Sequence, residues 1–219
     1  MKTSELFNLE KTIAKDLLIR TEYPWQILSE IKEFIKEIGD TLPEDKFIKV
    51  KDDIWIAKTA KVAETACLNG PLIIDEDAEI RHSAFIRGSV IVGKGAVVGN
   101  SSEVKNSIIF DNVQIPHYNY IGDSVLGYKA HFGAGALTSN VKSDKSLVSV
   151  VLDGTKQSTN LKKFGAMVGD EVEIGCHAVL CPGTIIGKNS TIYPLSMVRG
   201  TVEKESIFKN QDNIVIKER

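Results

Sequence analysis

A six-residue period of apolar side chains runs through most of this chain and limits the folds open to it. The first unbroken run comprises Ile56, Val62, Leu68, Ile74, Ile80, Ile86, Val92, Val98 and Val104. Small or aliphatic residues follow four positions later, namely Ala60, Ala66, Leu72, Ala78, Ala84, Val90, Ala96, Ser102 and Ile108. An α-helix, with 3.6 residues per turn, would scatter such a period around its surface. Short strands joined by turns every six residues would point these side chains into one interior.

The period then shortens by one residue and later returns. It passes through Ile109, Ile115, Ile121, Leu126 and Phe132, and resumes at Val168, Ile174, Leu180, Ile186, Ile192 and Val198. This pattern predicts a solenoid in which each coil contacts only its neighbours. We place the solenoid at residues 54–205, followed by a polar C-terminal tail at 206–219 that closes or leaves its end.

The repeat is interrupted at residues 141–166. Two short β-prone runs flank Asp153-Gly154 there, which is a strong hairpin signal. We therefore predict a loop that projects from one coil. Long excursions of this kind in compact domains are usually functional.

Residues 1–53 form a different region with helical periodicity. Thr3 or Ser4 is expected to cap a first helix whose apolar stripe is Leu6, Leu9, Ile13, Leu17 and Leu18. Pro24 is expected to start a second helix that stops at Gly39, with an apolar face of Ile27, Leu28, Ile31, Phe34, Ile35 and Ile38. This helical hairpin has too little core to stand alone, so we expect it to pack on the solenoid, capping one end, or on a neighbouring subunit.

Composition limits which binding partners and which cellular compartment can be expected for this protein. A net charge of −2 does not indicate binding to nucleic acid or to an anionic membrane. The cysteines Cys67, Cys176 and Cys181 lack CxxC spacing, so we expect reduced thiols rather than disulfides or a zinc framework. There is no signal-peptide core and no apolar run long enough to cross a bilayer. A soluble cytoplasmic protein is expected.

The period-six pattern resembles the hexapeptide-repeat family, which implies an all-β, left-handed parallel β-helix. Two stretches, HYNYIGDSVLG and FGAGALTSN, resemble particular enzymes within this family. They are similar to the acetyltransferase domain of the bifunctional N-acetylglucosamine-1-phosphate uridylyltransferase/glucosamine-1-phosphate acetyltransferase, and to the C-terminal domain of sugar-1-phosphate nucleotidylyltransferases. Residues 1–53 are too short for the nucleotidylyltransferase domain of those enzymes, so no pyrophosphorylase activity is expected.

The resemblance implies a role for each matching residue. His117 would be the general base, and acetyl-CoA the co-substrate. The implied sugar-phosphate ligands are Arg87, Lys105, Tyr120 and Lys163, with His131 where the family has an asparagine. The implied acetyl-CoA contacts are Ala134, Asn140, Cys176 in place of a serine, and Pro194 in place of an alanine. A C-terminal arginine of the family has no clear equivalent, since only Lys209 lies nearby.

These residue types suit acetyl transfer. A sugar amine is largely protonated near neutral pH, and a histidine titrates in the range needed to remove that proton. The turn Gly133-Ala134-Gly135 could present a backbone N–H to the developing oxyanion. Arginine and lysine side chains would bind the phosphate.

We therefore expect an acetyl-CoA-dependent N-acetyltransferase acting on an amino-sugar 1-phosphate of the glucosamine 1-phosphate type, assembled as a homotrimer. Ile109 and Phe110 are expected to be outward apolar residues at the subunit contact. An alternative is a non-catalytic sugar-nucleotide-binding or scaffold β-helix that partners a nucleotidylyltransferase. A zinc-dependent branch of the fold needs three converging histidines. His82 and His177 are expected to be structural or exposed instead, and no metal is expected.

Overall fold

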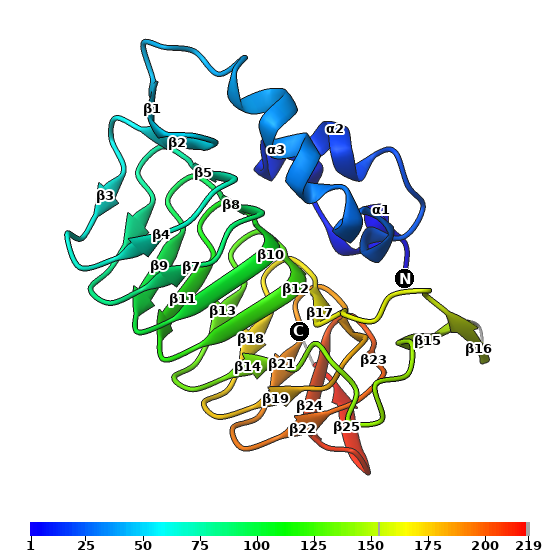
Figure 1. Ribbon diagram of the computed structural model, residues 1–219. Helices are drawn as coiled ribbons and strands as arrows, with labels where there is room; N and C mark the ends of the chain where they lie inside the picture. The colour runs from blue at the N-terminus through cyan, green and yellow to red at the C-terminus, as the bar shows by residue number, and fades with distance from the viewer. Residues whose placement is uncertain (153, 218–219) are drawn as a thin grey trace.

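The computed structural model describes residues 1–152 and 154–217, which form a three-sided parallel β-helix with helices along one side (Figure 1). The first face contains β2 (Ile54–Ala57), β5 (Leu72–Ile74), β8 (Val90–Val92), β17 (Ala166–Val168), β20 (Thr184–Ile186) and β23 (Thr201–Val202). The second face contains β3 (Lys61–Val62), β6 (Glu79–Ile80), β9 (Val97–Asn100), β11 (Gln114–His117), β13 (His131–Phe132), β18 (Glu173–Ile174), β21 (Thr191–Ile192) and β24 (Ser206–Asn210). The third face contains β4 (Cys67–Leu68), β7 (Phe85–Ile86), β14 (Leu137–Thr138), β19 (Val179–Leu180) and β22 (Met197–Val198).

Two long strands run from the third face round a corner into the first. They are β10 (Glu103–Ile109) and β12 (Tyr120–Leu126), and they pair in parallel along both faces. The corner residues of these strands, Asn106 and Asp123, have φ of 44° and 49°. Asn and Asp tolerate this left-handed conformation better than most residues, which is why the chain can turn there without glycine.

The stacking confirms the predicted repeat and the left-handed parallel β-helix. Ile56 lies beside Ile74, and Ile74 beside Val92, one coil of 18 residues apart. Ile109 pairs with Val92 after 17 residues, which is the one-residue shortening seen in the sequence. The predicted interior residues from Ile74 onward are buried. Val62 and Leu68 are less buried because their coil is the terminal one.

The N-terminal region differs from the predicted helical hairpin. It contains α1 (Thr3–Leu6), η1 (Leu9–Lys11), α2 (Lys15–Leu18), η2 (Pro24–Ser29) and α3 (Ile31–Gly39), so the first predicted helix is broken into short pieces. Lys2, rather than Thr3 or Ser4, is the N-cap residue, and its backbone N–H donates to Glu5. Pro24 does start a helical segment, although it is a 3₁₀ helix, and α3 ends at Gly39 as expected.

This N-terminal segment lies along the first face rather than capping an end. Its α3 helix contacts β5, β8 and β10. The outward side chains of the first face are consequently fully buried; they are Ile73, Ile91, Ile108, Val125, Met167 and Ile185. Ile108, expected in the interior, belongs to this outward row because it pairs with Ile91.

The expectation that Ile109 and Phe110 face outward for a subunit contact is wrong. Both have no exposed surface. Ile109 occupies the interior row beside Val92, and the ring of Phe110 packs against Phe7 of the N-terminal segment, with 5.1 Å between ring centroids. The chain itself covers this region.

Hairpins finish the two ends of the β-helix. β1 (Phe47–Lys51) pairs antiparallel with β2 at the first coil. At the other end, β24 pairs in parallel with β21, and β25 (Asn213–Ile216) folds back antiparallel on β24. The region after residue 205 thus contributes a strand to the last coil. The excursion at 141–166 holds the antiparallel strands β15 (Ser149–Leu152) and β16 (Thr155–Ser158). Asp153, expected in the turn of this hairpin, lies outside the described residues.

Candidate functional site

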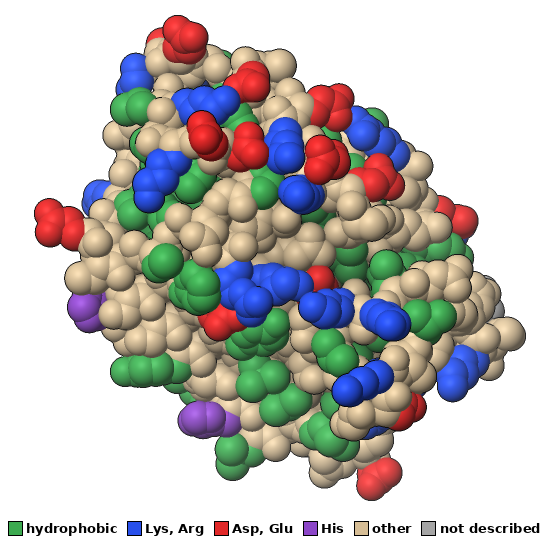
Figure 2. Space-filling view, viewed as in Figure 1, with side chains coloured by type: hydrophobic (Ala, Val, Ile, Leu, Met, Phe, Trp, Pro, Cys, Tyr) green, Lys and Arg blue, Asp and Glu red, His purple; other side chains and the backbone are tan. Residues whose placement is uncertain are grey.

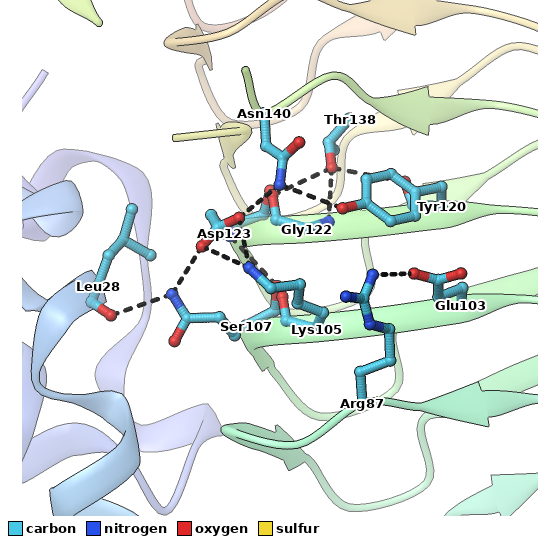
Figure 3. A network of polar contacts seen from close by, with 12 residues as sticks. Leu28, Arg87, Glu103, Lys105, Ser107, Tyr120, Gly122, Asp123, Thr138 and Asn140 are labelled. Carbon is cyan, nitrogen blue, oxygen red and sulfur yellow. Dashed lines mark hydrogen bonds and ion pairs between the residues drawn. The ribbon is translucent and has the colours of Figure 1, made fainter. Parts of the chain in front are cut away.

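A buried carboxylate, Asp123, lies at the corner between the third and first faces and bonds to Lys105, a predicted substrate residue (Figure 3). It also bonds to Asn140, a predicted acetyl-CoA contact that instead lies here, beside the predicted substrate residue Tyr120. Lys105 Nζ lies 3.1 Å from Asp123 Oδ2, and the Nδ2 of Asn140 donates to the same oxygen at 2.5 Å. The Nδ2 of Asn106 donates to Asp123 Oδ1 at 2.9 Å. The Asn140 amide also donates to the hydroxyl of Tyr120 at 3.1 Å. We call these residues the Asp123 cluster: Lys105, Asn106, Tyr120, Asp123 and Asn140.

The pKa of Tyr120 is raised from its ordinary value. Burial of the ring is the main cause, and the negative charge of Asp123 adds to it. Both effects disfavour the phenolate. Tyr120 therefore remains a neutral hydroxyl, able to donate a hydrogen bond, at neutral pH.

Two further predicted cations lie next to the Asp123 cluster. Arg87 is one coil before Lys105 in the same column and donates to Glu103 Oε1 at 2.7 Å. Lys163 is exposed and directly precedes Phe164, whose N–H donates to the carbonyl of Asn140 at 2.9 Å. Figure 2 shows Lys and Arg side chains gathered in a band over this part of β10 and β12. The band is where an anionic group would be attracted.

The predicted base and three predicted acetyl-CoA residues line the other edge of the third face. His117, Ala134, Cys176 and Pro194 occupy equivalent corner positions in successive coils, as the strand register requires. Their carbonyls link one coil to the next: those of His117, Ala134 and Cys176 accept from Gly135, His177 and Leu195 at 3.0, 2.9 and 2.9 Å. We call these four residues the corner ridge. Neighbouring coils lie about 4.8 Å apart, so the four residues of the corner ridge form a row that runs from coil to coil.

The turn at Ala134 leaves one donor free within the described residues. The N–H of Gly133 donates to Ile174 and that of Gly135 to His117. No hydrogen bond is formed by the N–H of Ala134 in the part of the chain that the structure describes. His117 beside it is exposed, and its own N–H is held by the side chain of Asn119 at 3.0 Å.

His131 does not join either group within one chain. It lies on the second face, where its Nδ1 is 2.7 Å from the carboxylate of Glu173 on the next coil. His82 is also engaged elsewhere, with Thr65 at 2.7 Å. Reaching the Asp123 cluster from His131 would require a second subunit.

Sequence reasoning missed the carboxylates and Asn106. Asp123 is the aspartate of the motif that contains His117 and Tyr120, so the motif was itself a signal. Glu103 and Asn106 could be found only through the coil register, which places Glu103 opposite Tyr120. As a result, two cations expected to be free for a ligand, Arg87 and Lys105, already pair with carboxylates.

Comparisons with known proteins agree with the hexapeptide β-helix. The profile of the GMPPB C-terminal domain matches residues 68–151. The bifunctional protein GlmU of Methanococcus vannielii is 39% identical over 112 residues, which is 51% of this chain and 27% of that protein. The bifunctional sugar-1-phosphate nucleotidylyltransferase/acetyltransferase of Sulfurisphaera tokodaii is 36% identical over 102 residues, 47% of this chain and 25% of that protein. The chain therefore spans about a quarter of the length of these relatives.

A solved structure of a hexapeptide transferase family protein from Anaplasma phagocytophilum covers 75% of this chain and 78% of its own, with 16% identity and a TM-score of 0.41. In fold, the chain is a parallel β-helix built on a six-residue repeat, as its own sequence period and strand register show. In sequence, its β-helix is similar to part of the GlmU and sugar-1-phosphate nucleotidylyltransferase/acetyltransferase proteins.

The described residues contain neither a membrane-spanning helix nor a cluster of metal ligands. None of their helices has the length and apolar character needed to span a bilayer. Among these residues, no three His, Cys, Asp or Glu side chains come together as ligands for a metal ion.

Proposed function

We propose that this protein is an acetyl-CoA-dependent N-acetyltransferase acting on an amino-sugar 1-phosphate of the glucosamine 1-phosphate type. One observation supports this most: the third face joins the Asp123 cluster, with Arg87 and Lys163 beside it, at one edge to the corner ridge with His117 at the other. Gly122, where the third face ends, is five positions after His117, a span of at most about 17 Å. A phosphorylated sugar bound at the cluster could therefore extend its amine toward the ridge.

In this proposal the phosphate binds to Lys105, Arg87 and Lys163, and the hydroxyl of Tyr120 donates to it. The ligand would compete with Asp123 and Glu103 for the two paired cations. Lys163 is exposed and forms no ion pair within the described residues, so it would supply charge without losing a partner. Charge-assisted hydrogen bonds to phosphate are strong enough to make such exchange feasible.

The acyl donor would lie along the corner ridge, with its thioester at Ala134 and His117. His117 accepts a proton from the ammonium group of the sugar, and the neutral amine attacks the thioester carbonyl. The N–H of Ala134 stabilises the oxyanion. The C–N bond forms as the nitrogen loses its second proton to solvent, the C–S bond breaks, and the coenzyme thiolate takes the first proton from His117.

We further propose a homotrimer, in which the second face of one chain packs against the third face of the next. Because the N-terminal segment covers the first face, the two open faces meet at the corner ridge. Three prisms placed around an axis at that corner form a closed ring of unlike faces. Such a ring would bring His131 of one subunit toward the Asp123 cluster of another.

Calorimetric titration with acetyl-CoA and with glucosamine 1-phosphate, followed by a thiol-release assay, tests this function. Binding of both compounds with release of coenzyme A is the expected result. The variant Lys105→Ala should raise KM for the sugar phosphate about tenfold, the effect of losing one charge-assisted bond. Binding of sugar ligands without thiol release would instead support the non-catalytic sugar-nucleotide-binding role.

A further inference from the structure

The 3₁₀ helix η2 touches the Asp123 cluster from outside the β-helix. The carbonyl of Leu28 accepts a hydrogen bond from the Nδ2 of Asn106 at 3.1 Å. The same nitrogen donates to Asp123 Oδ1 at 2.9 Å, so a single amide joins η2 to the central carboxylate. Figure 3 shows Leu28 on its helical segment beside the cluster, with the dashed contacts leading to Asp123.

A second contact joins η2 to the opposite side of the cluster. The ring of Trp25 stacks on that of Phe164, with 5.9 Å between centroids and 24° between planes. The N–H of Phe164 donates to the carbonyl of Asn140, and the N–H of Gly165 donates to the carbonyl of Asp123 at 2.8 Å. Lys163 is the residue just before Phe164. The stack therefore holds the point where the excursion re-enters the β-helix, together with its cation.

These contacts determine how the cluster is oriented. The side chain of Asp123 is 5% exposed, so its partners come from the protein rather than from solvent. Asn106 has φ of 44°, which limits the directions open to its side chain, and its amide must meet Leu28 and Asp123 together. Turning the Asp123 carboxylate would move both Lys105 and Asn140, since both bond to it.

We propose that η2 is a positioning element of the phosphate-binding site. Leu28 acts through Asn106 on the Asp123 carboxylate, and Trp25 acts through Phe164 on Asn140 and Lys163. The ligand class is a phosphate monoester, and this part of the proposal rests on the function proposed above. The N-terminal segment thus does more than cover apolar surface: it completes the site of a neighbouring structural unit.

Two variants and two matched controls test this role. Asn106→Gly keeps a residue suited to positive φ and removes the bridging amide. Its control is Asn112→Gly, at another corner with φ of 58° and away from the cluster. Trp25→Leu removes the stack on Phe164, and its control Phe7→Leu removes the equivalent packing of the same segment on Phe110. Trp25→Phe keeps an aromatic ring and serves as the rescue variant.

We expect Asn106→Gly and Trp25→Leu to raise KM for glucosamine 1-phosphate about tenfold, with kcat and KM for acetyl-CoA within about twofold of wild type. Hydrogen exchange at the amides of Phe164 and Gly165 should become faster in Trp25→Leu. Trp25→Phe should restore the wild-type KM for glucosamine 1-phosphate and the wild-type exchange rates at Phe164 and Gly165. The controls Asn112→Gly and Phe7→Leu should lower Tm without changing this KM.

Equal losses of Tm in Trp25→Leu and Phe7→Leu, with unchanged KM and unchanged exchange at Phe164 and Gly165, would overturn the proposal. The exchange measurement needs no substrate. If the wild type neither binds nor acetylates glucosamine 1-phosphate, the proposed function fails, whereas faster exchange in Trp25→Leu alone would still support the positioning role.

Discussion

At the scale of single residues, His117 is the most direct test of acetyl transfer. A positioned general base contributes about 10²–10⁴-fold to rate, so His117→Ala should lower kcat by that factor with little change in either KM. Because the side chain is exposed, Tm should hardly change. The acid limb of the pH profile of kcat/KM, measured by thiol release, should weaken in the variant. A raised KM with an intact acid limb would mean that His117 only positions the sugar.

Tyr120 gives a prediction in alkaline solution. Its pKa is raised in the folded state, first by burial and then by Asp123, so it should ionise after the exposed tyrosines. A raised folded pKa contributes stability below the unfolded value of about 10, and that stability is lost as pH rises through the folded value. Tyr120→Phe should therefore lose less stability than wild type as the pH rises above about 10.

The measurement for Tyr120 combines two titrations. Tyrosinate absorbance followed with pH should show the last-ionising component disappear in Tyr120→Phe. The same component should move to lower pH in Asp123→Asn, since one cause of the shift is removed. A component that does not respond to Asp123→Asn would show that the charge of Asp123 does not contribute to the raised pKa of Tyr120.

At the scale of elements, close coil contacts explain why glycine follows β-strand residues at several corners. A Cβ at Gly99 would lie 1.7 Å from the carbonyl oxygen of Pro116 on the next coil. Gly99→Ala must push these coils apart, and overpacking of this kind costs about 1–3 kcal/mol or more. Since Pro116 precedes His117, we expect a lower kcat as well as a lower Tm.

The control for Gly99→Ala is Arg81→Ala, one coil earlier in the same column. Arg81 is partly exposed and pairs with Glu79 at the surface, so its loss should change thermal stability little. Comparable melting curves for the two variants would contradict the steric argument.

The sequence predicted the elements of the β-helix better than their surroundings. The six-residue period settles which side chains point inward, because inward and outward positions alternate along each strand. The apolar stripe from Ile27 to Ile38 predicts that a helix face is buried, but not which surface covers it, so its place along the first face could not be foreseen. The Asp123 cluster depends on the register of β10 and β12, which the motif spacing alone does not give for Asn106 or Glu103.

At the scale of the whole molecule, the open corner should govern assembly. Tyr118, Leu195 and Met197 are 67%, 81% and 59% exposed around the corner ridge and the third face. Exposed apolar surface of this kind often marks an interface. Sedimentation velocity should show a trimer for the wild type and smaller species for Met197→Glu. Ile48→Glu, at a site on β1 that is 50% exposed, should remain trimeric. A stable, active wild-type monomer would exclude the assembly.

The path of the N-terminal segment also bears on how the molecule unfolds. A solenoid of nearest-neighbour contacts can fray from either end and leave the other half folded. Here the carbonyl of Leu6 accepts from Asp170, that of Lys11 accepts from Asp111, and Gly39 lies against the ring of Trp55. One continuous stretch is therefore fastened to early, middle and late coils. Unfolding any of these coils would break contacts with the same N-terminal segment. Thermal denaturation should therefore be a single cooperative transition rather than a stepwise loss of coils.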